Sequence, residues 1–465
     1  MPAPAMLTTR SLTILVVVVA VLVCAQLDDV TRGASAWVLA ALLLLAALAV
    51  VFWPRKHGPL APDEPERVRT LDLLRAGLVL GFTGFGGGYA VLTQIEHRAV
   101  ERERWLSSAD FVEAAALGQS LPGAVAFNVL GFIGWRLARL RGALALTVGF
   151  VLPSFLMLLV FALLYARLRQ VAAVQGLFHL LNPAVAGLVG AMTMRLATRV
   201  VSAPDGTPAG WRGLLRDRWA LAVLLGAGVC VGVVGLGVPE VVLAAGLVGL
   251  ARHEWRRRTE PGNGALALVP LVPFLARFGL VSESAWGSLH RLGELVGVFL
   301  RAGALTFGGG FVMIPLLEAE LVQGRHWLTP QAFVDAMTLG QVTPGPVVIT
   351  ATFVGYTLAG LAGAILSTIA VFLPSFALVT LVGASLERFR RAPGVQAFLQ
   401  GLQPAVVGLM AAATATLVRH GVHDVAGVVV AVVSFLLLWR TRLNPMWVVL
   451  ATGVLGAVVG LLPRG

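Results

Sequence analysis

The chain has 465 residues, of which 58% are hydrophobic and only 12% are charged. A soluble globular domain carries about 25% charged residues, so this composition excludes an ordinary soluble protein. The apolar runs are continuous and about 20 residues long, which is the length of a membrane-spanning helix, and the short alternating segments of an outer-membrane barrel are missing. The net charge of +12 is explained by arginines in cytoplasmic loops, so no nucleic-acid partner is expected.

The first part of the chain, residues 1–54, holds two apolar runs over 12–27 and 35–53, which predict a helical hairpin. Two aspartates follow the first run where a signal peptide would have a small-residue cleavage site, so the hairpin is expected to be retained. Residues 55–70 are rich in proline and charge and predict a cytoplasmic linker.

Two sets of about six apolar segments make up the rest of the chain, over residues 71–251 and 289–465. Between them, residues 252–288 contain a basic loop and a short apolar run, 264–280, which we interpret as a linking span. The predicted spans are 71–95, 109–135, 143–165, 172–198, 219–236 and 238–251, and then 290–316, 331–358, 364–386, 394–418, 424–439 and 445–462.

The two sets are copies of one another, because matched motifs recur in the same order. The offset is 222 residues (307 minus 85) up to a Pro-Gly pair, and one residue fewer after it. Such a series predicts a tandem duplication. The matched motifs are Phe85-Gly86-Gly87-Gly88 with Phe307-Gly308-Gly309-Gly310, Trp105 with Trp327, Gly118-Gln119 with Gly340-Gln341, Pro122-Gly123 with Pro344-Gly345, and Pro153-Ser154-Phe155 with Pro374-Ser375-Phe376.

Arginine placement indicates that the two copies are inverted. The loop after the second span of copy one carries three arginines, whereas the matching loop, 357–363, has no charge. The positive-inside rule then puts the first loop in the cytoplasm and the second outside, and the 264–280 run supplies the extra crossing that inversion requires. Arg167 and Arg169 fall on the predicted outside, so a parallel duplication stays open as the alternative.

The glycine triplets predict broken helices, because three consecutive glycines weaken a helix by roughly 1 kcal/mol each relative to alanine. Unwound backbone at membrane depth is tolerated only where it packs on protein or lines a cavity. A helix that restarts after a break exposes N–H groups and a positive dipole end, and Pro122 and Pro344 suit the first position of such a helix. Four such ends would bind a small anion. The alternative is that the glycines only allow close helix packing.

The candidate anion-binding residues combine the broken-helix backbone with nearby polar side chains. Arg301 lies in an apolar segment six residues before Phe307, with Arg75 as its counterpart, and the alternative is an arginine that snorkels to the interface. The neutral polar groups are alternatively helix–helix contacts. The full set is Gly86, Gly87, Gly88, Gln119, Pro122, Gly123, Arg301, Thr306, Gly308, Gly309, Gly310, Gln341, Pro344 and Gly345.

Four carboxylates also match between the copies, Glu96 with Glu318 and Glu113 with Asp335. They are candidates for carrying coupling protons, or else they lie at the interface and pair with arginines. No metal-ligand cluster and no nucleophile–base constellation is visible, so we expect no metal, no cofactor and no enzymatic activity.

These motifs together resemble the chromate ion transporter family in its long two-domain form, over about residues 70–460. The resemblance implies export of chromate, a small oxyanion that sulfate imitates. The sequence departs from the family pattern with Gly88 where Phe-Gly-Gly-Pro is common, and with Ala124 where Pro-Gly-Pro is typical.

The sequence therefore predicts an all-α, multi-pass protein of the cytoplasmic membrane, built as a tandem and inverted repeat with broken helices. The function we expect is secondary transport of chromate by alternating access. A carrier of sulfate or another oxyanion, or an anion channel, is the alternative, and the oligomeric state is open.

Overall fold

The computed structural model describes one compact unit, which lies within Arg67–Gly465. The predicted amino-terminal hairpin, nearly all of the linker, the 264–280 span, and Gly86, Gly308 and Gly309 lie outside the described residues. The described ranges are 68–84, 87–198, 200, 213–215, 217–234, 236–259, 287–306, 310, 312–382, 393–441 and 443–461.

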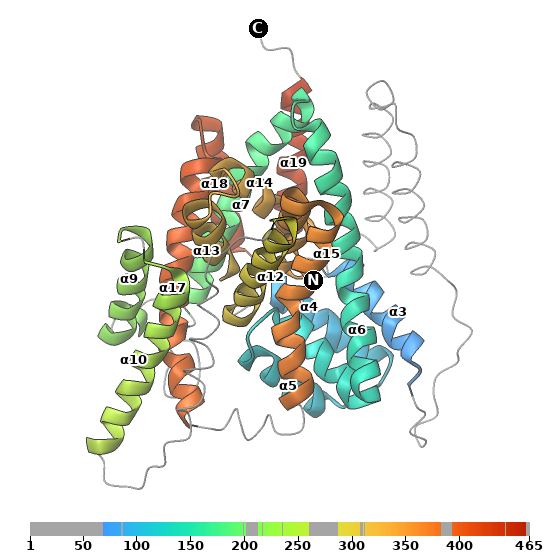
Figure 1. Ribbon diagram of the computed structural model, residues 1–465, viewed down its shortest axis with the longest axis vertical. Helices are drawn as coiled ribbons and strands as arrows, with labels where there is room; N and C mark the ends of the chain where they lie inside the picture. The colour runs from blue at the N-terminus through green and yellow to red at the C-terminus, as the bar shows by residue number, and fades with distance from the viewer. Residues whose placement is uncertain are drawn as a thin grey trace, which may run out of the picture. The chain divides into compact units, whose positions relative to one another are not determined.

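The described residues form helices and no strands (Figure 1). The all-α prediction is therefore confirmed. Repeat 1 contains α3 (Thr70–Thr83), α4 (Gly87–Glu96), the π-helix η1 (His97–Arg102), α5 (Ser108–Ser120), α6 (Val125–Leu168), α7 (Ala172–Ala197), α9 (Arg218–Gly232) and α10 (Val238–Thr259). Repeat 2 contains α12 (Gly287–Leu305), α13 (Met313–Glu318), the π-helix η2 (Ala319–Gly324), α14 (Pro330–Val342), η3 (Val347–Ile349), α15 (Thr350–Val382), α17 (Pro393–Gly421), α18 (Val425–Arg440) and α19 (Pro445–Leu461).

Helices α6 and α15 are each a hairpin of two antiparallel arms. The backbone leaves helical geometry at Ala138 and Arg139 in α6, and at the equivalent Ala359 and Gly360 in α15. In α15 the Ser367 hydroxyl donates to the Ala351 carbonyl at 2.6 Å, although residues 16 positions apart in a straight helix lie about 24 Å apart. The predicted reversal between the second and third spans of each copy is thus confirmed.

The two arms of the α6 hairpin differ in length. The long arm, 140–168, measures about 44 Å and is long enough to cross a bilayer. The short arm, 125–137, measures about 20 Å, less than the roughly 30 Å of the hydrocarbon core. The short arm is therefore too short to cross the bilayer by itself.

Four stretches of the described residues are long and apolar enough to cross a membrane. Two of them are the hairpins just described. Shorter apolar helices, α9, α18 and α19, lie beside them in the fold. The stretches are Val125–Tyr165, Ala172–Ala197, Val347–Thr380 and Gln396–Gly421.

The direction of packed arms shows that the two repeats are inverted. Phe127 in the short arm of α6 stacks on Phe372 with ring centroids 4.6 Å apart, and a Cβ on Gly131 would lie 3.1 Å from Val379. From the first of these contacts to the second, the residue number increases in both helices. The short arm of α6 therefore runs parallel to the long arm of α15. Because the arms of each hairpin are antiparallel, the equivalent short arms run in opposite directions. The parallel duplication is therefore excluded.

Helices α7 and α17 exchange partners between the repeats. Helix α7 packs against α18 and α19 of repeat 2, and its equivalent, α17, packs against α9 and α10 of repeat 1 (Figure 1). Glycines permit the contact, because a Cβ on Gly187 of α7 would collide with Ala431, and one on the equivalent Gly408 would collide with Leu224. The two repeats thus form one interlocked body rather than two separate halves.

Candidate functional site

The chain breaks where the sequence predicts. Helix α3 ends at Thr83 and α4 begins at Gly87, while α12 ends at Leu305 and α13 begins at Met313. The chain folds back at the first break, because the Thr83 hydroxyl lies 3.1 Å from Oε1 of Gln94 on α4. These breaks confirm that neither glycine-rich segment is a continuous helix.

The Pro-Gly breaks restart later than predicted. Helix α6 begins at Val125 with Ala124 as its N-cap, and the segment after Pro344 begins at Val347 with Pro346 as its N-cap. The prediction that Pro122 and Pro344 occupy the first helical position is therefore wrong. Each proline instead lies in a turn whose next residue, a glycine, has a positive φ angle: +103° at Gly123 and +105° at Gly345.

Four hydrogen bonds join the breaks across the two repeats in symmetric pairs. The Gly123 N–H donates to the Thr306 carbonyl at 2.5 Å, and the equivalent Gly345 N–H donates to the Gly84 carbonyl at 2.9 Å. The Ser154 hydroxyl donates to the Pro344 carbonyl at 2.6 Å, and the equivalent Ser375 hydroxyl donates to the Pro122 carbonyl at 3.0 Å. Each Pro-Gly break is thus fixed by the opposite repeat.

These contacts also explain why the turn residues are glycines. A positive φ is costly for any residue with a Cβ. A Cβ on Gly123 would in addition collide with the Ser375 hydroxyl, and one on Gly345 would collide with the Ser154 hydroxyl.

Repeat 1 has an additional brace at its Pro-Gly break. Asn128 is fully buried, and its Nδ2 donates to the Gly118 carbonyl at 3.1 Å and the Pro122 carbonyl at 3.0 Å. Its Oδ1 has no partner in the described part of the chain. Asn128 therefore holds the break open and leaves an acceptor beside Gly123, where an ideal Cβ would lie 3.6 Å from Oδ1.

The four breaks form one continuous region, which we call the central junction. Gly310, with φ of +89°, would place a Cβ 3.5 Å from both Val347 and Val348, so the second glycine break reaches the start of the α15 hairpin. The members of the central junction are Gly84, Pro122, Gly123, Ser154, Thr306, Gly310, Pro344, Gly345 and Ser375.

Hydrogen-bond donors at the junction are not all used. The start of α6 has no capping side chain, and Ala126 and Phe127 in its first turn are buried. A buried helix start without a capping partner calls for a ligand or water. The side-chain Nε2 of Gln341, four residues before Gly345, is likewise buried without a partner among the described residues. These groups are donors that suit an anion.

The other predicted junction residues are placed as follows. Gly87 and Gly88 are the first two residues of α4, and Gln119 is exposed at the end of α5. Thr306 is fully buried, and its hydroxyl donates to the Ala302 carbonyl of its own helix at 2.6 Å. The amides of Gly123 and Gly345 are used between the repeats and are not available to an anion.

Arg301 points away from its glycine break. Its Nε donates to the Gly297 carbonyl at 3.3 Å, one turn toward the start of α12, and its guanidinium pairs with Glu320 of η2 at 3.6 Å. Its counterpart Arg75 lies 3.9 Å from Asp72. A role for Arg301 in anion binding stays a prediction.

The π-helices carry matched ion pairs of reversed sign, which the sequence reading missed. Arg98 in repeat 1 pairs with Glu103 at 3.4 Å, and at the equivalent positions Glu320 pairs with Arg325 at 3.4 Å. Arg325 also reaches Glu294 at 3.4 Å. The offset of 222 relates these oppositely charged residues, so a search for identical residues could not find them.

The four matched carboxylates have different surroundings. Glu113 is half-exposed, with 50% of its side chain accessible, and lies 3.8 Å from Arg136, as the interfacial alternative predicts. Glu318 is buried and accepts from Gln323 at 3.1 Å, whereas Glu96 is partly exposed. Only in repeat 2, at Glu318 and Asp335, are these carboxylates buried.

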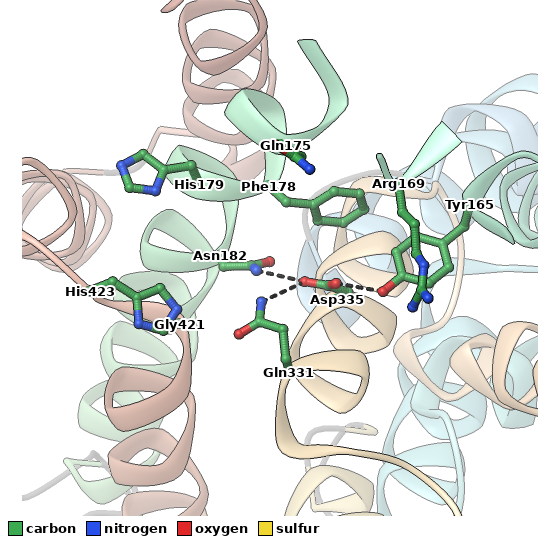
Figure 2. Close-up of a pocket in the computed structure, with 10 residues that line it drawn as sticks. All are labelled: Tyr165, Arg169, Gln175, Phe178, His179, Asn182, Gln331, Asp335, Gly421 and His423. Carbon is green, nitrogen blue, oxygen red and sulfur yellow. Dashed lines mark hydrogen bonds between the residues drawn. The ribbon is translucent and has the colours of Figure 1, made fainter. Parts of the chain in front are cut away.

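Asp335 lines a pocket of about 210 Å³ (Figure 2). Its carboxylate accepts hydrogen bonds from the Tyr165 hydroxyl at 2.7 Å, from Asn182 at 2.7 Å and from Gln331 at 3.1 Å. The sequence reading named Asp335 but not these partners. Tyr165 and Asn182 come from helices 170 and 153 residues away, and the signal that could have found them is polar residues in apolar spans. Among the described residues, no group of three metal-ligating side chains occurs.

The fold and the junction define a class of protein. Inverted repeats whose broken helices meet inside the bilayer are the architecture of secondary transporters. The sequence model of the chromate transporter family matches residues 71–250 and 293–457, one region in each repeat. The chain therefore belongs to the chromate transporter family, a family of transporters rather than enzymes, and is a multi-pass membrane protein.

Curated relatives of similar length support this assignment. The chain is 32% identical to the chromate transport protein of Cupriavidus metallidurans, over 82% of this chain and 91% of that protein. It is 32% identical to the chromate transport protein of Pseudomonas aeruginosa, over 82% and 90%. It is 29% identical to the probable chromate transport protein of Synechococcus elongatus, over 78% and 88%. No solved structure matches the chain significantly.

Proposed function

We propose that this protein is a secondary transporter that exports chromate across the cytoplasmic membrane by alternating access between its inverted repeats. The observation that carries the proposal is the central junction, where symmetric hydrogen bonds tie each break to the opposite repeat. Movement of one repeat against the other changes this region directly. The names of the relatives supply the substrate.

The anion is held by hydrogen-bond donors rather than by a dedicated cation. A tetrahedral dianion placed at the junction would accept from the N–H groups at the starts of α4 and α6 and from the Gln341 amide. The first helical turns add their positive dipole ends. Charge brought by Arg301 is already balanced by Glu320. Sulfate presents the same tetrahedron of oxygens, so it is the competitor that the test must include.

The test is uptake of radiolabelled chromate by purified protein in liposomes and by inside-out membrane vesicles. Export predicts accumulation in inside-out vesicles that saturates with chromate concentration and is inhibited less by sulfate than by unlabelled chromate. Stronger inhibition by sulfate would make the protein a sulfate carrier. Single-channel current across a bilayer at rates far above carrier turnover would make it an anion channel.

Variants of Gln341 test the location of the site. Gln341→Leu removes the unpartnered donor, and a hydrogen bond to a charged group contributes about 1.5–3 kcal/mol, so the half-saturation concentration should rise about tenfold or more. Gln403→Leu is the matched control, because Gln403 is exposed on α17. Equal half-saturation concentrations for Gln341→Leu and the wild type would place the anion elsewhere.

A further inference from the structure

Asp335 is a buried acid that the proposed anion site does not use. Its side chain comes from α14, and the residue is only 6% exposed. The three donors that reach it come from three places, Tyr165 on α6, Asn182 on α7 and Gln331 at the start of α14 itself. The carboxylate therefore ties α14 to two helices of the other repeat.

The surroundings of Asp335 suit a proton better than a metal cation. Sodium or another hard cation needs several oxygen ligands, but the groups that face the carboxylate present N–H and O–H donors. Gln331 and Asn182 each present an amide nitrogen to the carboxylate, and Oδ1 of Asn182 already accepts from the Thr338 hydroxyl at 2.7 Å. Edge-on ring contacts of Tyr165 with Phe178 at 5.6 Å and with Phe353 at 5.3 Å fix the hydroxyl in place.

The pocket gives water and protons a route to this acid. Figure 2 shows Asp335 between Tyr165, Asn182 and Gln331, with Arg169, His179 and His423 around it. Nε2 of His179, which lines the pocket, lies 3.0 Å from Asp424, which does not. The N–H of Gly427 donates to the Asp424 carboxylate at 2.7 Å, a hydrogen bond that favours the ionised form of this second acid. The titratable and charged groups around Asp335 are Tyr165, Arg169, His179 and His423, with Asp424 behind His179.

This arrangement occurs in one repeat only. The equivalent of Asp335 is Glu113, which is half-exposed and lies near Arg136. The offsets of 221 and 222 put Leu386, Gln403, Ala109 and Ala116 at the positions equivalent to Tyr165, Asn182, Gln331 and Thr338. Three of these four cannot supply a side-chain hydrogen bond. A feature needed only for packing two symmetric halves would be expected in both, so its presence in one half indicates a separate role.

We propose that Asp335 is the group that binds and releases the coupling proton of transport, a proposal that rests on the proposed function. On protonation an O–H bond forms on the carboxylate, with the proton taken from the bulk solution on the side to which the pocket is open, and on release it returns to the bulk solution. The acid then has fewer acceptor sites for Tyr165, Asn182 and Gln331, and the contact of α14 with α6 and α7 weakens. Gln341 lies six residues further along α14, about 9 Å, so a shift of α14 is transmitted to the central junction.

The experiment separates proton coupling from chromate binding in proteoliposomes. Chromate exchange at equal pH on both sides requires no net proton movement, whereas accumulation against a chromate gradient requires the pH gradient. Asp335→Asn should keep the rate of exchange within about threefold of the wild type. Its accumulation of chromate under a pH gradient should be at least tenfold lower than that of the wild type. Glu113→Gln, the matched control in repeat 1, should keep both.

Tyr165→Phe provides a second variant that keeps the ring contacts and removes one donor to the carboxylate. Losing a hydrogen bond that favours the ionised form should move the pH of half-maximal transport upward, while maximal exchange stays within about threefold. A wild type that carries no chromate would overturn the proposed function itself. A wild type that is driven by pH, with Asp335→Asn equally driven, would overturn only the role of Asp335, as would accumulation driven by a sodium gradient instead of a pH gradient.

Discussion

Ser154 and Ser375 tie each Pro-Gly break to the opposite repeat. Both are fully buried, and each donates to a proline carbonyl of the other copy. A buried carbonyl left without a donor costs about 1–3 kcal/mol, so these hydroxyls contribute to holding the repeats in register. The Pro122 carbonyl accepts from a second side chain, Asn128. Among the described residues, the Pro344 carbonyl accepts from the side chain of Ser154 alone.

Gly123→Ala should lower both the melting temperature in detergent and chromate uptake. The added Cβ meets the Ser375 hydroxyl and sits on a backbone with φ of +103°, and overpacking of this kind costs about 1–3 kcal/mol. Combining it with Ser375→Ala should recover part of the melting temperature, because the colliding oxygen is removed.

Gly226→Ala on α9 is the control for that pair of variants. An ideal Cβ at Gly226 meets nothing within 4 Å, so its melting temperature should not fall. Additive effects of Gly123→Ala and Ser375→Ala, with no recovery, would show that the two residues do not touch across the repeats.

Arg301→Gln distinguishes an ion pair from an anion ligand. The structure pairs Arg301 with Glu320, and both side chains are mostly buried, with 22% and 17% exposure. We therefore expect Arg301→Gln to lower the melting temperature and to leave the half-saturation concentration for chromate within about twofold. Glu320 keeps Arg325 as a partner at 3.4 Å, so the loss should be modest, and the double variant with Glu320→Gln should lose less stability than the two single variants added together. A tenfold rise in half-saturation that Glu320→Gln does not reverse would make Arg301 an anion ligand, as the sequence predicts.

Residue types alone predicted where the helices break, but not which residues the breaks contact. The glycine triplets and Pro-Gly pairs are local signals, and the breaks at Gly84 and Pro122 follow from them. The partners of these breaks are 190 and 253 residues away in sequence for the two serine bonds, and no local pattern carries that information. The matched Pro-Ser-Phe motifs marked both serines, and their role became visible only in three dimensions.

Helix direction is the feature of the elements that decides how the repeats are related. The α6 and α15 hairpins each turn within two residues, at equivalent positions, and their equivalent short arms run in opposite directions. The hairpin turns therefore lie at opposite ends of the pair. The arginine counts in the sequence predict the same arrangement independently. The turn of α6 is arginine-rich, which favours the cytoplasmic side, whereas the turn of α15 is uncharged.

Cysteine labelling should place the two hairpin turns on opposite sides of the membrane. Arg141→Cys and Leu361→Cys suit this test, because both positions are exposed and lie just past the turns. They are introduced singly after Cys24 and Cys230 have been replaced. A membrane-impermeant maleimide should label the first in inside-out vesicles and the second in right-side-out vesicles. Labelling of both from the same side would contradict the inverted arrangement.

At the scale of the whole molecule, the two repeats are related by a pseudo-two-fold axis that passes close to α7 and α17. Thr193 and Thr414 are equivalent residues, 221 positions apart, and their hydroxyls lie 3.3 Å from each other. Equivalent residues touch only near the axis that exchanges them. The asymmetric features, the Asp335 pocket above all, lie away from this contact and distinguish the two halves chemically.

Alternating access in an inverted repeat exchanges the conformations of the two halves. Contacts on the pseudo-two-fold axis keep the same partners in the inward-open and outward-open states, whereas contacts away from the axis change their partners. A Thr193→Cys/Thr414→Cys disulfide, formed in a background without Cys24 and Cys230, should therefore leave chromate uptake within about threefold of the reduced protein. The measurement is uptake before and after oxidation, with the cross-link confirmed by mass spectrometry and reversed by a reductant. If oxidation abolishes uptake and the reductant restores it, α7 and α17 slide past each other during transport. The boundary between the moving parts would then run between these two helices, which we take to be fixed.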